Sequence, residues 1–169
     1  MKYFNGFSLK DEEQFFKAQL VEGSYVVAGF SFGAQKAFEY AYQSDQRIDR
    51  LILLSPAFFQ NHKKSFIKTQ LRYFKADQTS YTEQFLKNVA YPSTISLNDY
   101  LAKGVYEELE ELLTYTWDVE KIKELLQRGI TIEVFMGEED KIVEVSKSFE
   151  FFSEFVHVYL IKDVGHLLQ

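Results

Sequence analysis

Five short apolar runs recur along the chain and are separated by longer amphipathic stretches. Parallel strands joined by helical connections produce this alternation, because strands that are buried on both faces read as continuous apolar runs. The pattern therefore predicts an α/β domain with a parallel sheet. The predicted strands are Lys2–Phe4, Tyr25–Phe30, Leu51–Leu54, Thr131–Met136 and Val156–Ile161.

Three helices are predicted between these strands. Ser8 and Asp11 have the spacing of a capping box, with Asp in place of Glu or Gln, and they predict a helix after the first strand. The other two helices are predicted from apolar residues at helical spacing. The apolar face of the first helix is Leu9, Phe16 and Leu20, that of the second is Ala34, Ala37, Phe38 and Ala41, and that of the third is Val145, Phe149, Phe152 and Phe155.

The interval between the third and fourth predicted strands is long and carries helical patterns. The length of this interval favours a helical insertion over a structureless loop. We therefore expect a single domain, 1–169, with a helical lid at about 57–128 that lies over a site. The stretches expected to be helical are Ser65–Lys75, Tyr81–Val89, Ser96–Thr116 and Val119–Arg128.

The segment Gly29-Phe30-Ser31-Phe32-Gly33 lies where the second predicted strand meets the alanine-striped helix. It has the G-x-S-x-G pattern of a nucleophile elbow, in which glycines flank a strained serine because bulky residues would collide with the strand and helix. Such a turn exposes the Ser31 hydroxyl and aims the backbone N–H of Phe32 at a bound carbonyl oxygen. A tight strand-to-helix turn that merely contains a serine is the alternative interpretation.

A serine nucleophile needs a base, and the chain contains three histidines. His166 follows Gly165 beyond the last predicted strand, where an α/β sheet presents its ligand-contacting loops. His157 lies within that strand and His62 lies in a polar stretch, so His166 is the expected base. The alternative for His166 is an exposed residue near the end of the chain.

Asp140 is the expected carboxylate that would hold the imidazole in the right tautomer. It ends the turn Gly137-Glu138-Glu139-Asp140 after the fourth predicted strand, and Glu138 and Glu139 are its local competitors. Capping of the following helix is the alternative role for Asp140. The chain order Ser31, Asp140, His166 is the order that α/β-hydrolases use.

The loop Asn5-Gly6-Phe7-Ser8 follows the first predicted strand, where a second oxyanion donor normally lies. The backbone N–H of Phe7 is the candidate donor, with Gly6 allowing close approach. A plain turn in which Ser8 caps the next helix fits the residue types equally well.

Composition excludes several kinds of chemistry. The 169 residues include no cysteine, which excludes disulfides, thiolate nucleophiles and Cys-ligated metal sites. The net charge of −6 argues against nucleic-acid binding, and no apolar run approaches the ~20 residues that span a bilayer. We therefore expect a soluble cytoplasmic protein without nucleic-acid or membrane partners. The chemistry expected of Ser31, His166 and Asp140 needs no metal and no organic cofactor.

One segment departs from the acidic average. No acidic residue occurs between Arg50 and Ala76, and four cations would share one face of a helix at i, i+4, i+8 and i+11. Such a face would steer an acidic partner toward the protein, while an ordinary solvated helix face is the alternative. The four residues are Lys64, Lys68, Arg72 and Lys75.

With these residues identified, the chain resembles the α/β-hydrolase superfamily over nearly its whole length. Its elbow, its Gly137-Glu138-Glu139-Asp140 turn and its Gly165-His166 segment are similar to that family's elbow, acid turn and histidine loop. The resemblance implies a truncated α/β-hydrolase fold of about five mostly parallel strands, with flanking helices, a helical lid and right-handed crossovers. The chain departs from the family in its short segment before the elbow and in Asn5-Gly6, where the family has His-Gly.

More narrowly, the start of the chain and its elbow resemble the short pimeloyl-acyl carrier protein methyl ester carboxylesterases of biotin synthesis. This resemblance implies hydrolysis of the methyl ester of a carrier-bound dicarboxylate, with the acyl carrier protein docking on the four cations. A general short-chain carboxylesterase or thioesterase with the same three residues is one alternative. A non-catalytic binding module with the hydrolase fold is another.

Overall fold

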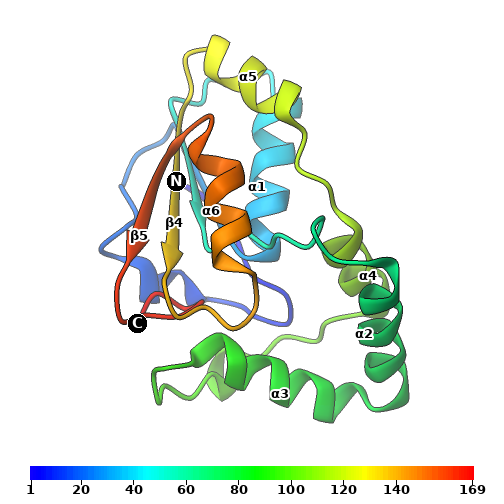
Figure 1. The fold of residues 1–169 in the computed structure, drawn as a ribbon. Helices are drawn as coiled ribbons and strands as arrows, with labels where there is room; N and C mark the ends of the chain where they lie inside the picture. Colours follow the sequence, from blue (N-terminus) through cyan, green and yellow to red (C-terminus); the bar gives the residue numbers. More distant parts are fainter.

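The computed structural model describes residues 1–169 and contains one sheet of five parallel strands that are adjacent in chain order (Figure 1). Every predicted strand is present, with its ends within one residue of the expected ends. The α/β class with flanking helices is therefore confirmed. The strands are β1 (Lys2–Phe4), β2 (Val26–Phe30), β3 (Arg50–Leu54), β4 (Thr131–Gly137) and β5 (His157–Ile161).

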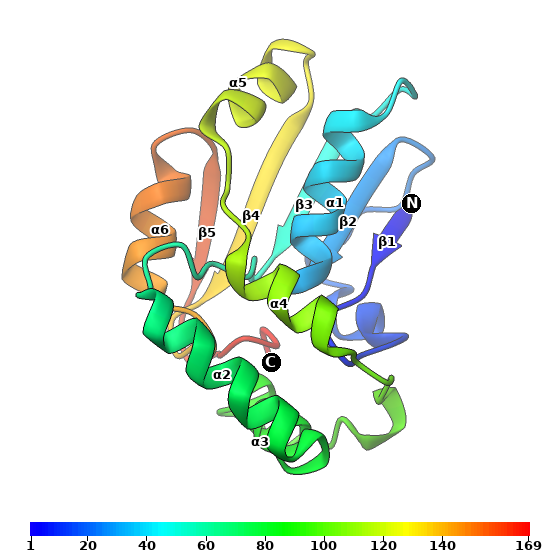
Figure 2. The same cartoon turned by 90° about the vertical axis from the view of Figure 1, so that its right-hand side faces the viewer.

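One face of the sheet is covered by three helices: α1 (Phe32–Gln43), α5 (Val119–Gln127) and α6 (Val145–Ser153) (Figure 2). The alanine-striped face of α1 is buried as predicted, and its small side chains let the helix lie close to β2 and β3. In α6, Phe152 is buried in the same core, whereas Phe155 lies beyond the helix end.

The opposite face of the sheet carries a second apolar cluster. Alternate residues of β2 and β3 point to the two faces, so Val27 and Leu51 belong to the first core and Ala28 and Ile52 to the second. Phe16, fully buried, fills the second core beside Phe30, with 4.8 Å between the two ring centroids. The sheet is therefore packed on both sides around β2, the strand that leads into the elbow.

The helix predicted from Ser8 and Asp11 is wrong in extent and in its cap. The chain forms only a short 3-10 helix, η1 (Glu12–Phe16). Ser8 and Asp11 have φ angles of 58° and 56°, and Asp11 makes no side-chain capping bond. Left-handed residues at both positions end any regular helix that would include Leu9.

The hand of the first connection also differs from the expectation. Leu9 and Phe16 pack in the second core, whereas α1, α5 and α6 contribute to the first. All five strands advance in one direction across the sheet, so connections that lie on opposite faces have opposite hands. The expectation that every crossover is right-handed is therefore wrong.

Helices α2 (Lys64–Ala76), α3 (Gln78–Ala90) and α4 (Tyr106–Thr114) gather at the carboxyl end of the strands (Figure 1). We call 60–116 the lid. The fourth expected helix of the insertion, α5, lies instead at the opposite end of α1, beside the start of β4. No helix of the structure has the length and apolar character needed to cross a membrane.

The helix expected over Ser96–Thr116 is wrong in its first half. That half contains the short 3-10 helix η2 (Asn98–Tyr100) and an extended segment in which Leu101 forms a β-bridge with Leu9. The N–H of Ala102 donates to the carbonyl oxygen of Ser8 at 2.9 Å. This part of the lid is therefore tied to the loop that follows β1.

Candidate active site

Ser31 lies in the turn between β2 and α1, with φ 55° and ψ −113°. A positive φ at a residue other than glycine is strained and has to be held by its surroundings. The N–H of Ser31 donates to Leu54 at 2.9 Å, and its carbonyl oxygen accepts from Ala34 at 3.1 Å and Ala57 at 3.2 Å. These bonds fix the backbone of Ser31 on both sides.

The two glycines that flank Ser31 are required by close backbone contacts. A Cβ atom at Gly29 would overlap the carbonyl group of Gly33. A Cβ atom at Gly33 would overlap the carbonyl oxygen of Phe4 at the end of β1. The G-x-S-x-G spacing thus has the physical cause expected from the sequence, and it brings β1 against the start of α1.

His166 contacts Ser31 directly. Its Nε2 atom lies 2.9 Å from Ser31 Oγ, and its Nδ1 atom lies 2.6 Å from Asp140 Oδ2. His166 is fully buried, and its carbonyl oxygen accepts a hydrogen bond of 2.6 Å from the Ser55 hydroxyl. The structure therefore joins the serine, histidine and aspartate proposed from the sequence in one hydrogen-bonded chain.

Asp140 is held by the turn that follows β4. Its Oδ1 atom accepts from the N–H groups of Ile142 at 2.6 Å and Val143 at 3.1 Å, which leaves Oδ2 for His166. The helix that follows has Glu144 at its N-cap, so Asp140 does not cap it. Its neighbours Glu138 and Glu139 are exposed.

The other two histidines lie elsewhere. His157 is exposed in β5, with its ring centroid 4.4 Å from that of Tyr159. His62 precedes α2 and stacks on Phe66 at 4.3 Å. Only His166 is within hydrogen-bonding distance of Ser31.

Three chain segments meet behind His166, and the sequence did not reveal this contact. A Cβ atom at Gly137 would overlap the carbonyl oxygen of Gly165, and one at Gly165 would overlap that of Tyr91, just after α3. The N–H of Leu167 also donates to Val89 in α3 at 3.1 Å. The signal in the sequence was the glycine that begins each of the segments Gly-Glu-Glu-Asp and Gly-His. A glycine near a strand end permits another backbone to approach closely.

The two proposed oxyanion donors, Phe32 and Phe7, have free N–H groups and line a common cavity. Phe32 is the first residue of α1, where helical N–H groups have no acceptor in the preceding turn and the helix dipole is positive. Neither Phe32 nor Phe7 donates its N–H to another protein group. Both residues line a cavity of about 300 Å³.

The pair Ser31 and His166 is closed off from solvent. Ser31 is 2% exposed and His166 is 0% exposed. Above the loop after β1, the ring of Phe7 lies 6.0 Å from that of Phe74 in α2 and 5.7 Å from that of Phe85 in α3. A substrate could reach Ser31 only if part of the lid moved.

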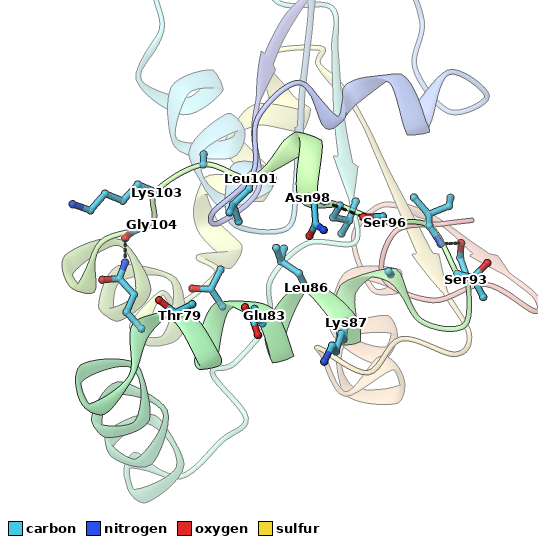
Figure 3. Close-up of a pocket in the computed structure, with 17 residues that line it drawn as sticks. Thr79, Glu83, Leu86, Lys87, Ser93, Ser96, Asn98, Leu101, Lys103 and Gly104 are labelled. Carbon is cyan, nitrogen blue, oxygen red and sulfur yellow. Dashed lines mark hydrogen bonds between the residues drawn. The ribbon is translucent and has the colours of Figure 1, made fainter.

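The largest cavity of the molecule, about 900 Å³, lies at a different place, between α3 and the segment 93–104 (Figure 3). Polar side chains such as Thr79, Glu83 and Asn98 line it, and Leu86 and Leu97 form part of its apolar surface. Neither Ser31 nor His166 lines this cavity. No group of three His, Asp or Glu side chains is arranged to hold a metal ion.

The four cations noted in the sequence all lie on α2 and are exposed. None of them forms an ion pair, and α2 also buries Leu71 and Phe74. We call Lys64, Lys68, Arg72 and Lys75 the α2 cationic face.

Chemically, the hydrogen-bonded chain can make a hydroxyl group nucleophilic. An imidazole that accepts the serine proton becomes an imidazolium, and a buried carboxylate on its other nitrogen stabilises that charge. A reactive serine, a base and two free N–H donors are the components needed for acyl transfer.

Comparison with known proteins places this geometry in a family. The sequence matches the family described as alpha/beta hydrolase fold over residues 6–120. A search of curated protein sequences gave no match.

Several solved structures share the fold at low sequence identity. A bromoperoxidase from Bacillus anthracis aligns with a TM-score of 0.66 and 20% identity over 85% of this chain and 60% of its own. Carboxylesterase CesB (YbfK) from Bacillus subtilis aligns with a TM-score of 0.56 and 18% identity over 93% of this chain and 57% of its own. This chain thus spans less than two thirds of the length of either protein. MenH from S. aureus aligns with a TM-score of 0.58 and 14% identity over 97% of this chain and 85% of its own.

Proposed function

Because this chain belongs to the alpha/beta hydrolase family, we propose that it is a serine hydrolase that cleaves carboxylic esters. Ser31 attacks the ester carbonyl while His166 takes its proton, and Asp140 orients the imidazole and stabilises its charged form. The N–H groups of Phe32 and Phe7 hold the oxyanion. His166 then activates the water that releases the acyl group.

The observation that carries this proposal is the hydrogen-bonded chain Ser31–His166–Asp140, with distances of 2.9 and 2.6 Å. All three side chains come from loops at the carboxyl ends of β2, β4 and β5, where α/β sheets bind ligands. An ester bound there would meet the serine hydroxyl with its base already in place.

The first test is chemical labelling of Ser31. We expect the protein to hydrolyse p-nitrophenyl butyrate and to react with a fluorophosphonate probe at Ser31. The variant Ser31→Ala should lose the label and at least about 10⁴-fold in kcat, because the nucleophile is gone. Ser146→Ala, an exposed serine in α6, is the matched control and should keep both. Labelling of Ser31→Ala, or absence of label in the unaltered protein, would contradict the proposal and would favour a non-catalytic binding module.

We further propose that the substrate is the methyl ester of a carrier-bound dicarboxylate, pimeloyl-acyl carrier protein methyl ester, as in biotin synthesis. The support is the resemblance of the chain start and elbow to that family, together with the α2 cationic face. Unpaired exposed cations on the lid are suited to steer an acidic carrier toward the site.

A charge reversal on α2 tests the carrier. The double variant Lys68→Glu/Arg72→Glu should lower kcat/KM for the carrier-bound methyl ester by about 10-fold or more, because like charges now oppose docking. Hydrolysis of p-nitrophenyl butyrate should stay within about 2-fold. The control Arg47→Glu/Lys123→Glu makes the same charge change at the amino end of the sheet and should leave both substrates unaffected.

The alternative substrates give different outcomes in the same assays. A general short-chain carboxylesterase would prefer the free ester and would not respond to the charge reversal. A thioesterase would cleave the thioester link to the carrier in place of the methyl ester, and mass spectrometry of the carrier distinguishes these two products.

A further inference from the structure

Glu12 is a fully buried carboxylate that the proposed mechanism does not use. It lies in η1, and its Oε1 atom accepts a hydrogen bond of 2.7 Å from the N–H of Gly6 and one of 3.3 Å from the Tyr3 hydroxyl. Its Oε2 atom is buried without any partner. Burial raises the pKa of Glu12, because a charge is costly in a site without water.

The residue that Glu12 contacts is the flexible point of the loop carrying Phe7. Glycine adopts many backbone angles, so Gly6 alone would leave the direction of the next peptide undefined. Two hydrogen bonds restrict it: the N–H of Gly6 donates to Glu12, and its carbonyl oxygen accepts from Leu9 at 3.2 Å. The peptides on both sides of Gly6 are thereby fixed.

The direction of the Phe7 N–H follows from the second of these peptides. In a planar trans peptide the C=O and N–H bonds point in opposite directions. Because the Gly6 carbonyl is turned toward Leu9, the Phe7 N–H points away from Leu9 and remains free. The ring of Phe30 closes the remaining side, since a Cβ atom at Gly6 would lie 2.8 Å from it.

We propose that Glu12 is a positioning residue for the oxyanion site: by holding Gly6 through its N–H, it keeps the N–H of Phe7 aimed at the reacting oxygen. This inference rests on the proposed serine hydrolase function. It gives a role to a buried carboxylate that has one unpaired oxygen. Glu12 does not touch the substrate and acts only through the loop.

The groups around Glu12 leave its acceptor role intact. Tyr3 in β1 and the neighbouring Glu13 are the titratable groups that act on it. Burial and the adjacent carboxylate raise the pKa of Tyr3, so its hydroxyl stays a donor at any working pH. The bond from Gly6 to Oε1 needs an acceptor at that position and not a negative charge.

This distinction between geometry and charge defines the experiment. Glu12→Gln keeps an acceptor oxygen at the same reach without the charge, and kcat for p-nitrophenyl butyrate should stay within about 3-fold. Glu12→Asp keeps the carboxylate but shortens the side chain by one methylene group, so its oxygens no longer reach Gly6. Glu12→Ala removes the carboxylate. Both should lower kcat by about 10- to 100-fold with KM changed less than about 3-fold, as expected when one oxyanion donor is misplaced.

A tetrahedral inhibitor provides a second readout that a merely structural role would not move. Affinity for a trifluoromethyl ketone, whose adduct carries an oxyanion, should fall in parallel with kcat across the Glu12 series. Tyr3→Phe is the matched control, because it removes the other hydrogen bond to Oε1 and spares the one from Gly6. It should keep kcat within about 3-fold even if the melting temperature falls.

The outcomes separate this inference from the proposed function. Rates are expressed per active site, and the sites are counted by complete fluorophosphonate labelling of Ser31. Loss of folded protein in a variant therefore does not change the measured kcat. If Glu12→Asp is as active as Glu12→Gln, or if Glu12→Gln loses as much as Glu12→Ala, the positioning role is wrong while the hydrolase stands. If the unaltered protein neither labels nor hydrolyses esters, both proposals are overturned.

Discussion

At the scale of single residues, Ser31 shows how the site is made from backbone geometry. A φ of 55° at a serine costs on the order of 1–3 kcal/mol, and the hydrogen bonds to Leu54, Ala34 and Ala57 sustain it. The same geometry turns the hydroxyl toward His166 Nε2 at 2.9 Å. The same backbone conformation of Ser31 therefore causes both the strain and the alignment of its hydroxyl with His166.

This strain predicts an unusual order of stabilities. Ser31→Gly should be more stable than Ser31→Ala by about 1 kcal/mol, because glycine adopts a positive φ without strain, although its unfolded chain is more flexible. Urea denaturation of the two inactive variants measures the difference. At Ser146 in α6, where the backbone is helical, the same pair should show the opposite order. A Ser31→Ala variant at least as stable as Ser31→Gly would show that the turn is unstrained.

The sequence predicted the three side chains of the hydrogen-bonded chain and missed Glu12, which contacts the loop after β1. Ser31, Asp140 and His166 each follow an apolar run, in the chain order that α/β-hydrolases use, so residue type and position were sufficient to propose them. Glu12 gave no such signal, because its burial depends on the left-handed backbone at Ser8 and Asp11. The spacing of Ser8 and Asp11 predicted only a helix start in that stretch, and the role of Glu12 depends on its tertiary contact with Gly6.

At the scale of elements, close backbone contacts join the acid turn, the histidine loop and the end of α3. Gly137 lies against Gly165, and Gly165 lies against Tyr91, with no room for a side chain at either glycine. The site is therefore assembled from contacts between loops whose own backbones are irregular. Its precision depends on the packing of those loops and not on one element alone.

Adding one methyl group at either of these glycines should displace the histidine loop and therefore His166. Gly165→Ala and Gly137→Ala should each destabilise the protein by at least about 2 kcal/mol and lower kcat by about 100-fold, because a shift of about 1 Å in His166 is enough for that. Gly23→Ala is the control, since its nearest contact is a side-chain atom at 3.3 Å. Urea denaturation and p-nitrophenyl butyrate kinetics measure both effects. Full activity in Gly165→Ala would show that the loop relaxes freely.

The sequence predicted well the elements that pack against a sheet or another helix. The alanine stripe of α1 and the apolar residues of α2 repeat at helical spacing against a sheet or another helix. The failures lie at 8–20 and in the first half of Ser96–Thr116, where Leu9 pairs with Leu101. Gly104 in that segment lies against Ser8 and Phe7, a contact between distant segments that no local pattern encodes.

At the scale of the whole molecule, charge is distributed unevenly. The chain carries a net charge of −6, while the α2 cationic face exposes four unpaired positive side chains on the lid. Under the proposed carrier docking, an acidic partner would be attracted to this helix, while the net charge of the chain would oppose general association. Such an arrangement favours one docking orientation more than it favours tight binding.

Salt should consequently act on one substrate only. Raising NaCl from about 50 mM to about 500 mM shortens the range of charge interactions severalfold, so kcat/KM for the carrier-bound ester should fall by about 10-fold. Hydrolysis of p-nitrophenyl butyrate should change by less than about 2-fold. The Lys68→Glu/Arg72→Glu variant should lose most of this salt response. Equal salt effects on both substrates would contradict carrier docking at α2.

The contacts between the histidine loop and α3 have a consequence for the resting state of the proposed hydrolase. Leu167 is hydrogen-bonded to Val89, and Gly165 lies against Tyr91, so the base is anchored to the lid that encloses it. An excursion of the carboxyl end of α3 that admitted solvent would also loosen His166 from Ser31. Under the proposed mechanism, the open molecule is therefore inactive, because Ser31 lacks its base whenever solvent can reach it.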